Sequence, residues 1–166
     1  MRLLIDACAV INLHNCGKLA TICDLPDTEI ALSPIVVSEC GLDCAAEIIA
    51  LEAAGRVQFV PDTEISTDRF LDLVAEHDIG DGELESITVC EATNRAFCTD
   101  DAAARRLASN LLGAPEVMGS LRLLKFAVEA SLLKCSDAFE GYLQMRDSGG
   151  FLPELQTDFF CIGAPV

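Results

Sequence analysis

Short, predominantly apolar segments alternate along this chain with longer segments of helical periodicity, and this alternation narrows the choice of fold more than any other feature. The apolar segments suit strands and are residues 3–5, 29–32, 57–60, 95–99 and 116–118. Between them, apolar residues recur three or four positions apart, as on one face of a helix. Strands separated by helices form a parallel sheet with helices on both faces. The sequence therefore predicts a single three-layer α/β/α domain over residues 1–166, with a central parallel sheet.

Serine residues precede several of the predicted helices and are the expected N-caps. Ser33 stands before Pro34, a residue type that favours the first helical position, and Ser120 and Ser136 precede two later helical segments. Ser66, or its neighbour Thr67, is expected to cap the helix that follows residue 67. Further helices are expected over residues 82–94 and after residue 101.

Acidic residues stand where predicted strands end and where predicted helices begin. Asp6 ends the first strand, and Asp100 and Asp101 follow the strand of residues 95–99. Glu39 lies roughly a turn and a half into the helix that starts at residue 34, and Glu83 lies near the start of the helix over residues 82–94. Ligands of open α/β sheets bind at the carboxyl ends of the strands. We therefore expect these carboxylates to share one edge of the sheet, where they repel one another unless a positive charge lies between them.

Each acidic residue, taken alone, has a simpler interpretation. An aspartate after a strand is often a helix N-cap, an acid in a first helical turn can complement the helix dipole, and Glu39 could be an ordinary surface charge. The register around Gly82 leaves open whether Asp81 or Glu83 is the third acid of a site. Glu85 lies about 200° around the helix from Glu83 and is expected to face away. The number and order of the carboxylates indicate a site more strongly than any one of them does.

The charge is strongly negative and unevenly distributed. The formal net charge of −16 weighs against a general nucleic-acid coat protein, because phosphate binding requires the opposite sign. Residues 1–94 carry 18 acidic and 4 basic residues, whereas residues 95–134 carry 4 acidic and 6 basic residues. The side chains in this basic segment that we expect to face a phosphate-bearing substrate are Arg105, Arg106, Arg122 and Lys125. The alternative is that they are solvent-exposed charges on ordinary helix faces.

The cysteines and the apolar segments bear on metal content and location. None of the nine cysteines forms a C-x-x-C pair, and the chain has only two histidines, so a zinc site is not expected. The cysteines are interpreted as small buried apolar side chains of a reduced protein. No apolar run is long enough to span a membrane, and the N-terminus reaches a charge at Asp6 too early for a signal peptide. A cytoplasmic protein without a membrane segment is therefore expected.

Four segments, in their order and spacing, resemble the PIN-domain nucleases. They are the opening strand that ends in Asp6 with Asn12 downstream, residues 36–39 ending in Glu39, residues 82–87 around Glu83, and residues 99–105 around Asp100. Residues 117–124 are also similar to a glycine-led helix in the branch that contains the VapC-like toxins and their solitary relatives. No single segment is specific, but together they cover most of the chain. The resemblance implies a PIN-like fold and nuclease activity.

The same resemblance implies that Asp6, Glu39, Glu83 and Asp100 are catalytic, metal-binding acids, with Asp101 as an outer or fifth ligand. Hard oxygen ligands of this kind select Mg²⁺ or Mn²⁺, and metal-activated water can hydrolyse a phosphodiester without a serine or cysteine nucleophile. The implied substrate is RNA. The implied partners are a basic antitoxin-like protein, which the charge of −16 favours electrostatically, and a second copy of the chain in a homodimer. The alternative is a PIN-like binding module that keeps the acids but has no catalytic activity.

Two other families also place an aspartate at the end of a first strand, and the sequence argues against both. Phosphatases of the haloacid dehalogenase type require a second acid two residues later, where this chain has Cys8. Response-regulator receivers require an acidic pair, a phosphorylated aspartate and a lysine at a late strand end, and that lysine is missing here. A mechanism through a covalent aspartyl phosphate is therefore not expected.

Overall fold

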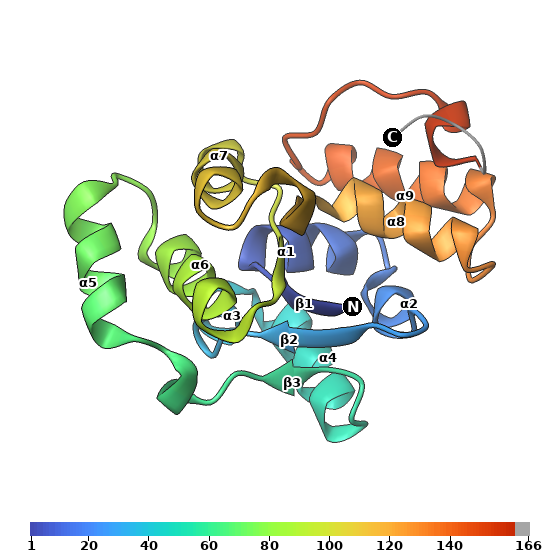
Figure 1. The fold of residues 1–166 in the computed structure, drawn as a ribbon. Coiled ribbons are helices and arrows are strands. Elements are labelled where there is room, and N and C mark those ends of the chain that lie inside the picture. Colours follow the sequence, from blue (N-terminus) through green and yellow to red (C-terminus); the bar gives the residue numbers. More distant parts are fainter. Residues whose placement is uncertain (162–166) are drawn as a thin grey trace.

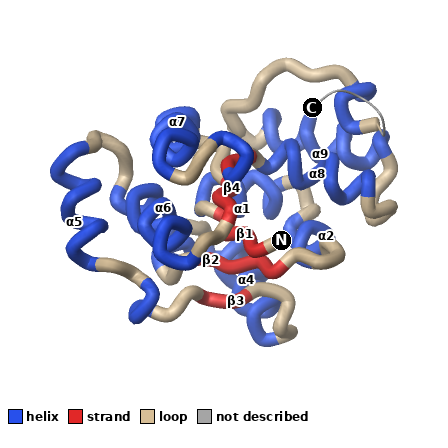
Figure 2. Tube along the Cα trace, viewed as in Figure 1, coloured by secondary structure: helices blue, strands red, loops and turns tan. Residues whose placement is uncertain are grey.

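Five parallel strands form the central sheet, in the order β3-β2-β1-β4-β5 (Figures 1 and 2). The structure is a computed structural model that describes residues 1–161. The strands are β1 (Arg2–Ile5), β2 (Glu29–Leu32), β3 (Gln58–Phe59), β4 (Ala96–Cys98) and β5 (Val117–Met118). The helices in this part of the chain are α1 (Ala7–Asn15), α2 (Leu19–Cys23), α3 (Ile35–Glu39), α4 (Leu42–Ala53), α5 (Thr67–Glu76), α6 (Asp81–Thr93), α7 (Ala102–Leu111), α8 (Ser120–Glu129) and α9 (Cys135–Asp147), with short 3-10 turns η1 (Asp62–Glu64), η2 (Ala114–Glu116) and η3 (Thr157–Phe160). None of these helices is long and apolar enough to cross a membrane.

Helices cover both faces of the sheet, so the predicted three-layer α/β/α fold is confirmed. Successive strand residues point to opposite faces. Leu3 and Ile5 of β1 therefore join a core beneath α1, α2, α4, α8 and α9, whereas Leu4 joins a second core beneath α5, α6 and α7. Figure 1 shows α5, α6 and α7 grouped apart from α8 and α9. Burial on both faces explains why the strands are almost wholly apolar.

The strand order places a crevice at the carboxyl ends of β1 and β4. Hydrogen bonds from Asp6 N to Cys98 O (2.9 Å) and from Thr99 N to Met118 O (2.9 Å) align the ends of β1, β4 and β5. The helix after β1 packs on one face of the sheet, and the helix after β4 packs on the other. In open α/β sheets this reversal is where ligands bind. The acidic residues predicted at the strand ends thus lie at this reversal.

The serine caps expected from the sequence are only partly present. Ser66 caps α5 by accepting a hydrogen bond from Arg69 N at 3.4 Å, as predicted. The expectation is wrong for Ser33, whose hydroxyl is buried and has no hydrogen-bond partner within residues 1–161. It is wrong for Ser136, which lies inside α9. It is also wrong for Ser120, which is already the first residue of α8 and bonds a carboxylate outside the helix.

The cysteines do not all behave as isolated apolar side chains. Cys135 and Cys161 form a disulfide between the start of α9 and the end of η3, which corrects the expectation of a fully reduced chain. The other seven are free thiols, of which only Cys8 and Cys40 are more than slightly exposed. Cys8 belongs to the site described next.

Candidate active site

Asp6 directly follows β1 and is 2% exposed. Its Oδ2 accepts hydrogen bonds from Thr99 Oγ1 at 2.6 Å and from Cys8 Sγ at 3.1 Å. Burial raises the pKa of Asp6, and the hydrogen bonds from Thr99 and Cys8 oppose that shift. Burial and the charge of Asp6 also raise the pKa of the Cys8 thiol to about 12, so this thiol stays protonated and can donate. The carboxylate is therefore held in one orientation between the ends of β1 and β4.

Asp100 lies just beyond β4, and its side chain is 5% exposed. Oδ2 accepts hydrogen bonds from Asn12 Nδ2 at 2.7 Å and from Ser120 Oγ at 2.6 Å, and Oδ1 accepts one from Ser120 N at 2.9 Å. Arg105 places Nη2 3.6 Å from Oδ1. Helices α1, α7 and α8 thus each supply one residue that orients this carboxylate.

Glu39 and Glu83 bring two further carboxylates to this edge from α3 and α6. Burial raises the pKa of the half-buried Glu83, and the negative charges of Asp6 and Asp101 raise it further. Partial burial also raises the pKa of Glu39, with additional contributions from the charges of Glu83, Asp6 and Glu85. Such contributions require nearby negative charge. Asp6, Glu39 and Glu83 therefore lie near enough for their charges to act on one another, at the edge of the sheet that the sequence predicts for them.

The first turn of α6 lies against the carboxylate of Glu39. A β-carbon added at Gly82 would come within 2.5 Å of Glu39 Oε1, so the glycine permits this close approach. Asp81 is exposed at the start of the same helix, and the geometry favours Glu83 as the third acid. Glu85 is not among the charges that act on Glu83, in line with its expected direction away from Glu83, but it is not isolated from the site. Its charge reaches Glu39, because α3 lies close to that side of α6, and its Oε1 is buried without a hydrogen-bond partner among the described residues.

A cavity of about 350 Å³ opens beside these carboxylates. Glu83, Asp100 and Asp101 line its acidic side, and Cys8 links it to the buried Asp6. The segment after α9, which includes Phe151, closes the cavity on another side. A ligand in this cavity would therefore meet several carboxylates at once.

Comparison with known families shows the family of the chain as a whole. A family model described as a PIN domain (DUF3368) matches residues 2–157, which is most of the chain. The chain belongs to the PIN-domain family. Searches among curated proteins and among solved structures found no match. PIN domains are generally nucleases, and the resemblance predicted from the acidic segments is confirmed at the level of the family.

The acids of this PIN domain suit a divalent cation by donor type and by charge. Asp6, Glu39, Glu83 and Asp100 offer only hard oxygen ligands, which Mg²⁺ and Mn²⁺ prefer. The raised pKa values of the first three show that their ionised forms are disfavoured by their surroundings, and a cation would reverse this effect. Within residues 1–161, no three His, Cys, Asp or Glu side chains are grouped closely enough to hold an ion as they stand. The residues fit a metal chemically without forming a complete cage.

Asp101, predicted as an outer or fifth ligand, is the N-cap of α7. Its Oδ1 accepts hydrogen bonds from Ala103 N at 2.8 Å and Ala104 N at 2.7 Å. The simpler interpretation of an aspartate after a strand therefore applies to Asp101. It also applies to Asp6, whose carboxylate accepts a hydrogen bond from Cys8 N at the start of α1. Asp101 still lines the cavity and still acts on Glu83, so capping does not remove it from the site.

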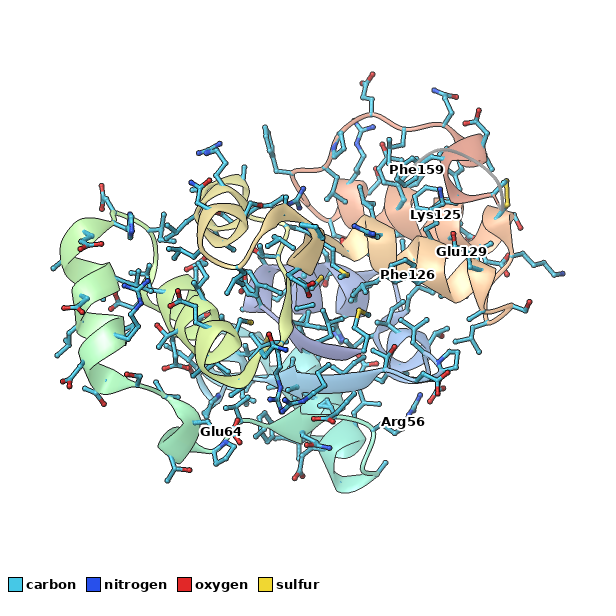
Figure 3. All side chains as sticks on the ribbon, viewed as in Figure 1. Arg56, Glu64, Lys125, Phe126, Glu129 and Phe159 are labelled. Carbon is cyan, nitrogen blue, oxygen red and sulfur yellow. A yellow bond between two sulfur atoms is a disulfide. The ribbon has the colours of Figure 1, made fainter. Side chains whose placement is uncertain are left out.

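The four basic residues predicted to face substrate do not share one environment. Arg105 Nη2 donates a hydrogen bond to Thr99 O at 2.8 Å, and the Arg105 side chain is 45% exposed. The neighbouring Arg106 is also exposed. Arg122 is half-buried. Lys125 is 1% exposed, and its Nζ lies 5.4 Å from the centre of the Phe159 ring (Figure 3). A buried ammonium cannot reach a phosphate in solvent, so the structure corrects the prediction for Lys125.

For three residues, the sequence did not predict a part in the site. Thr99 orients Asp6, Cys8 bridges Asp6 and the Asp100 backbone, and Ser120 binds Asp100. Each lies within three residues of the end of a strand, and this position is the signal that was available. It could not show which carboxylate each would bind, because that depends on the register between β1, β4 and β5.

Proposed function

We propose that this PIN domain is a ribonuclease that requires Mg²⁺ or Mn²⁺ and hydrolyses RNA phosphodiester bonds. The observation that supports this most directly is the gathering of Asp6, Glu39 and Glu83 beside Asp100, at the edge of the sheet where ligands bind. Burial raises the pKa of Asp6, Glu39 and Glu83, and neighbouring negative charges raise the pKa of the two glutamates further. Perturbed carboxyl groups in a cavity are typical of functional sites.

Asp6, Glu39, Glu83 and Asp100 would hold the metal. The bound ion would supply a nucleophilic water near neutral pH and positive charge for the phosphate oxygens. The role of the surrounding residues is to fix the acids in place. Thr99 and Cys8 hold Asp6, whereas Asn12 and Ser120 hold Asp100. Locked side chains of this kind keep a site in its working geometry.

Arg105 and Arg106 are proposed to attract the RNA backbone to this edge. Arg105 is fixed beside Asp100, and Arg106 is exposed one residue further along α7. Phosphate contacts from such residues position a strand without reading its sequence. Their charge also offsets part of the repulsion that a chain of net charge −16 exerts on RNA.

The proposal is tested with a fluorogenic single-stranded RNA in Mn²⁺, in Mg²⁺ and in EDTA. Wild type should cleave only with a divalent ion, and Asp6→Asn and Asp100→Asn should each lose at least about a hundredfold in kcat/KM, which is about 2.7 kcal/mol. Asp81→Asn, an exposed acid on the first turn of α6, is the matched control and should keep its activity. Circular dichroism should be the same for all four proteins. Full activity of both site variants would reject the proposed acids.

A binding module without catalysis is the second candidate. Two observations favour it: the described acids do not form a ready metal cage, and the overall charge repels RNA. Under this alternative the wild type binds a partner but cleaves no RNA with any of the ions. The cleavage assay therefore separates the two candidates directly.

We further propose that the ribonuclease acts as the toxin of a toxin–antitoxin pair, with a basic partner protein. Support comes from the charge of −16 and from the acidic cavity, which a basic side chain could enter. Co-purification with the product of an adjacent reading frame, followed by the same cleavage assay, tests this. An adjacent product that binds without reducing cleavage would argue against a toxin role.

A further inference from the structure

A second hollow, of about 640 Å³, lies next to the acidic cavity. It is bounded by the starts of α7 and α8 and by residues 151–153 after α9. Figure 1 shows the segment after α9, in red, arching over α9 and α8 before it reaches η3. Its walls are mainly apolar, with Leu121, Phe151 and Phe159 among them. We refer to this hollow as the aromatic groove.

The aromatic groove is continuous with the acidic cavity. Asp100 and Phe151 line both spaces. Phe151 is completely exposed, at 101% of its reference area, although a phenylalanine without a partner normally avoids water. A flexible polymer whose phosphate sat at the acids would therefore place a neighbouring unit against this ring.

Two arginines add positive charge to the otherwise apolar groove. Arg105 is half-exposed beside Asp100. Arg122 stands over the Phe126 ring at 5.4 Å, and no carboxylate within residues 1–161 forms an ion pair with it. Its Nε is buried and has no hydrogen-bond partner in the same part of the chain. An unpaired guanidinium is unexpected in a chain with 27 acidic residues, and an anionic ligand in the groove would supply its partner.

We propose that the aromatic groove binds an unpaired base of single-stranded RNA, next to the nucleotide whose phosphate lies at the acids. Phe151 supplies the face on which the base stacks, and Arg105 and Arg122 bind the adjoining backbone. Aromatic rings together with positive charge are how proteins hold single strands, since every base has a face that can stack. A base inside a duplex has both faces covered and cannot enter. The inference rests on the proposed ribonuclease function and adds a base-binding site beside the acids, with Phe151 as its stacking residue.

The test measures binding rather than cleavage. Wild-type protein in EDTA is titrated into a short fluorescein-labelled RNA, and fluorescence anisotropy reports binding. The RNA is used as a single strand, as a duplex, and as a set of single strands that each carry one abasic nucleotide. The single strand should bind more tightly than the duplex. Phe151→Ala should weaken its binding by roughly 5- to 150-fold, which corresponds to the 1–3 kcal/mol of one stacked base.

Matched variants separate stacking from general packing. Phe151→Trp should retain the affinity, whereas Phe151→Leu should fall close to Phe151→Ala because leucine has no aromatic face. Leu71→Ala, at an exposed apolar residue on α5, should leave the affinity unchanged. In the set of abasic strands, one abasic position should weaken binding to wild type but not to Phe151→Ala, since the missing base and the missing ring belong to the same contact.

The outcomes for the groove and for the nuclease are distinct. Equal affinity of wild type and Phe151→Ala for the single strand overturns the groove proposal even if RNA is cleaved. Equal loss for single strand and duplex overturns it as well, as does wild type that binds none of these RNAs. If the stacking pattern appears but no ion supports cleavage, the groove proposal stands and the ribonuclease proposal falls.

Discussion

Ser120 binds Asp100 with two hydrogen bonds, one from its backbone N–H to Oδ1 at 2.9 Å and one from its hydroxyl to Oδ2 at 2.6 Å. Ser120 is the first residue of α8, so the positive end of the helix dipole also faces this carboxylate. Asn12 and Arg105 complete the surroundings of Asp100. Hydrogen-bond donors and a guanidinium thus surround Asp100, whereas Glu39 and Glu83 lie among other negative charges. Substitutions at these acids should therefore have opposite effects on stability.

Ser120→Ala should lower both stability and activity. The change removes a buried hydrogen bond to a charged group, which is worth about 1.5–3 kcal/mol, but leaves the bond from the backbone N–H. The freed Asp100 Oδ2 keeps only the bond from Asn12, so its orientation is less fixed. Urea denaturation and RNA cleavage would measure the two effects. Ser136→Ala, at an exposed serine on α9, is the control; a Ser120 variant as stable and active as this control would contradict the role assigned here.

The metal-free protein should lose stability through Glu83 as the pH rises. The pKa of Glu83 is raised above its ordinary value of 4.5 by burial and by the charges of Asp6 and Asp101, so the folded state binds the proton more tightly than the unfolded state does. This contribution is fully present below pH 4.5 and is lost as the pH rises through the raised pKa. Glu83→Gln removes the titrating group. This variant should therefore become increasingly more stable than wild type as the pH rises from 4.5 through the raised pKa of Glu83.

Melting temperatures of both proteins, measured in EDTA at a series of pH values, check this prediction. Other acids titrate in the same window, so the difference between the two proteins is the relevant quantity. Glu52→Gln on the exposed part of α4 serves as the reference. A difference for Glu83→Gln that stays as flat with pH as that of Glu52→Gln would mean that Glu83 is not in contact with the other acids.

Gly82→Ala should separate folding from function. The added β-carbon would lie 2.5 Å from Glu39 Oε1, and a flexible glutamate can move aside at little cost. Alanine is favoured over glycine within a helix by about 1 kcal/mol, so stability should be unchanged or slightly higher. Displacement of Glu39 should nevertheless reduce RNA cleavage by about tenfold or more.

The double variant Gly82→Ala/Glu39→Ala tests the cause of that loss. If the β-carbon acts only by moving Glu39, it should have no effect once this carboxylate is absent. A full additional loss in the double variant would show that Gly82 matters for another reason, such as direct contact with RNA.

The layers of the fold were predictable because they depend on local pattern. The alternation of apolar strands with helices determines the sheet and its helical covering, and an aspartate after a strand is informative wherever that strand lies. What could not be predicted depends on contacts between distant segments. Ser120 looked like a cap, but the alignment of β4 with β5 brings it to Asp100. Lys125 has the charge of a substrate-binding residue, and only the packing of η3 over α8 shows that it is buried.

The acidic site was predicted by residue but not by arrangement. Helical geometry alone places Glu85 away from Glu83, which holds for α6 by itself. It fails as an argument about the site because α3 delivers Glu39 to the side of α6 where Glu85 lies. Which acids interact is decided by how α3 and α6 meet, and local patterns in the sequence do not reveal that packing.

Arg106→Ala should weaken RNA binding and flatten its dependence on salt. Each phosphate contact on a single strand contributes about 0.7 to the slope of log K against log salt concentration, so losing one contact should reduce the slope by about that amount. Arg69→Ala is the control, because Arg69 is paired with Glu91 at 2.9 Å in the last turn of α6, whereas Glu83 lines the cavity from the first turn. Anisotropy titrations from low to moderate salt measure both slopes. Equal slopes in wild type and Arg106→Ala would make Arg106 an ordinary solvated charge.

Mn²⁺ or Mg²⁺ should raise the melting temperature of the wild type. A cation that binds only the folded state adds about 2.7 kcal/mol of stability at one hundred times its dissociation constant.

Two variants divide this effect into its causes. Glu83→Gln removes a repelling charge, so without metal at neutral pH it should melt as high as wild type or higher, and the ion should raise its melting temperature less. Asp100→Asn instead disrupts the hydrogen bonds from Ser120 and Asn12 and the ion pair with Arg105, so without metal it should melt lower. Thermal scans in EDTA, Mg²⁺ and Mn²⁺, with Ca²⁺ as a hard-cation comparison, measure all of these shifts. A wild type that is indifferent to every ion would show that the carboxylates do not act together on a cation, and the metal-dependent mechanism would have to be abandoned.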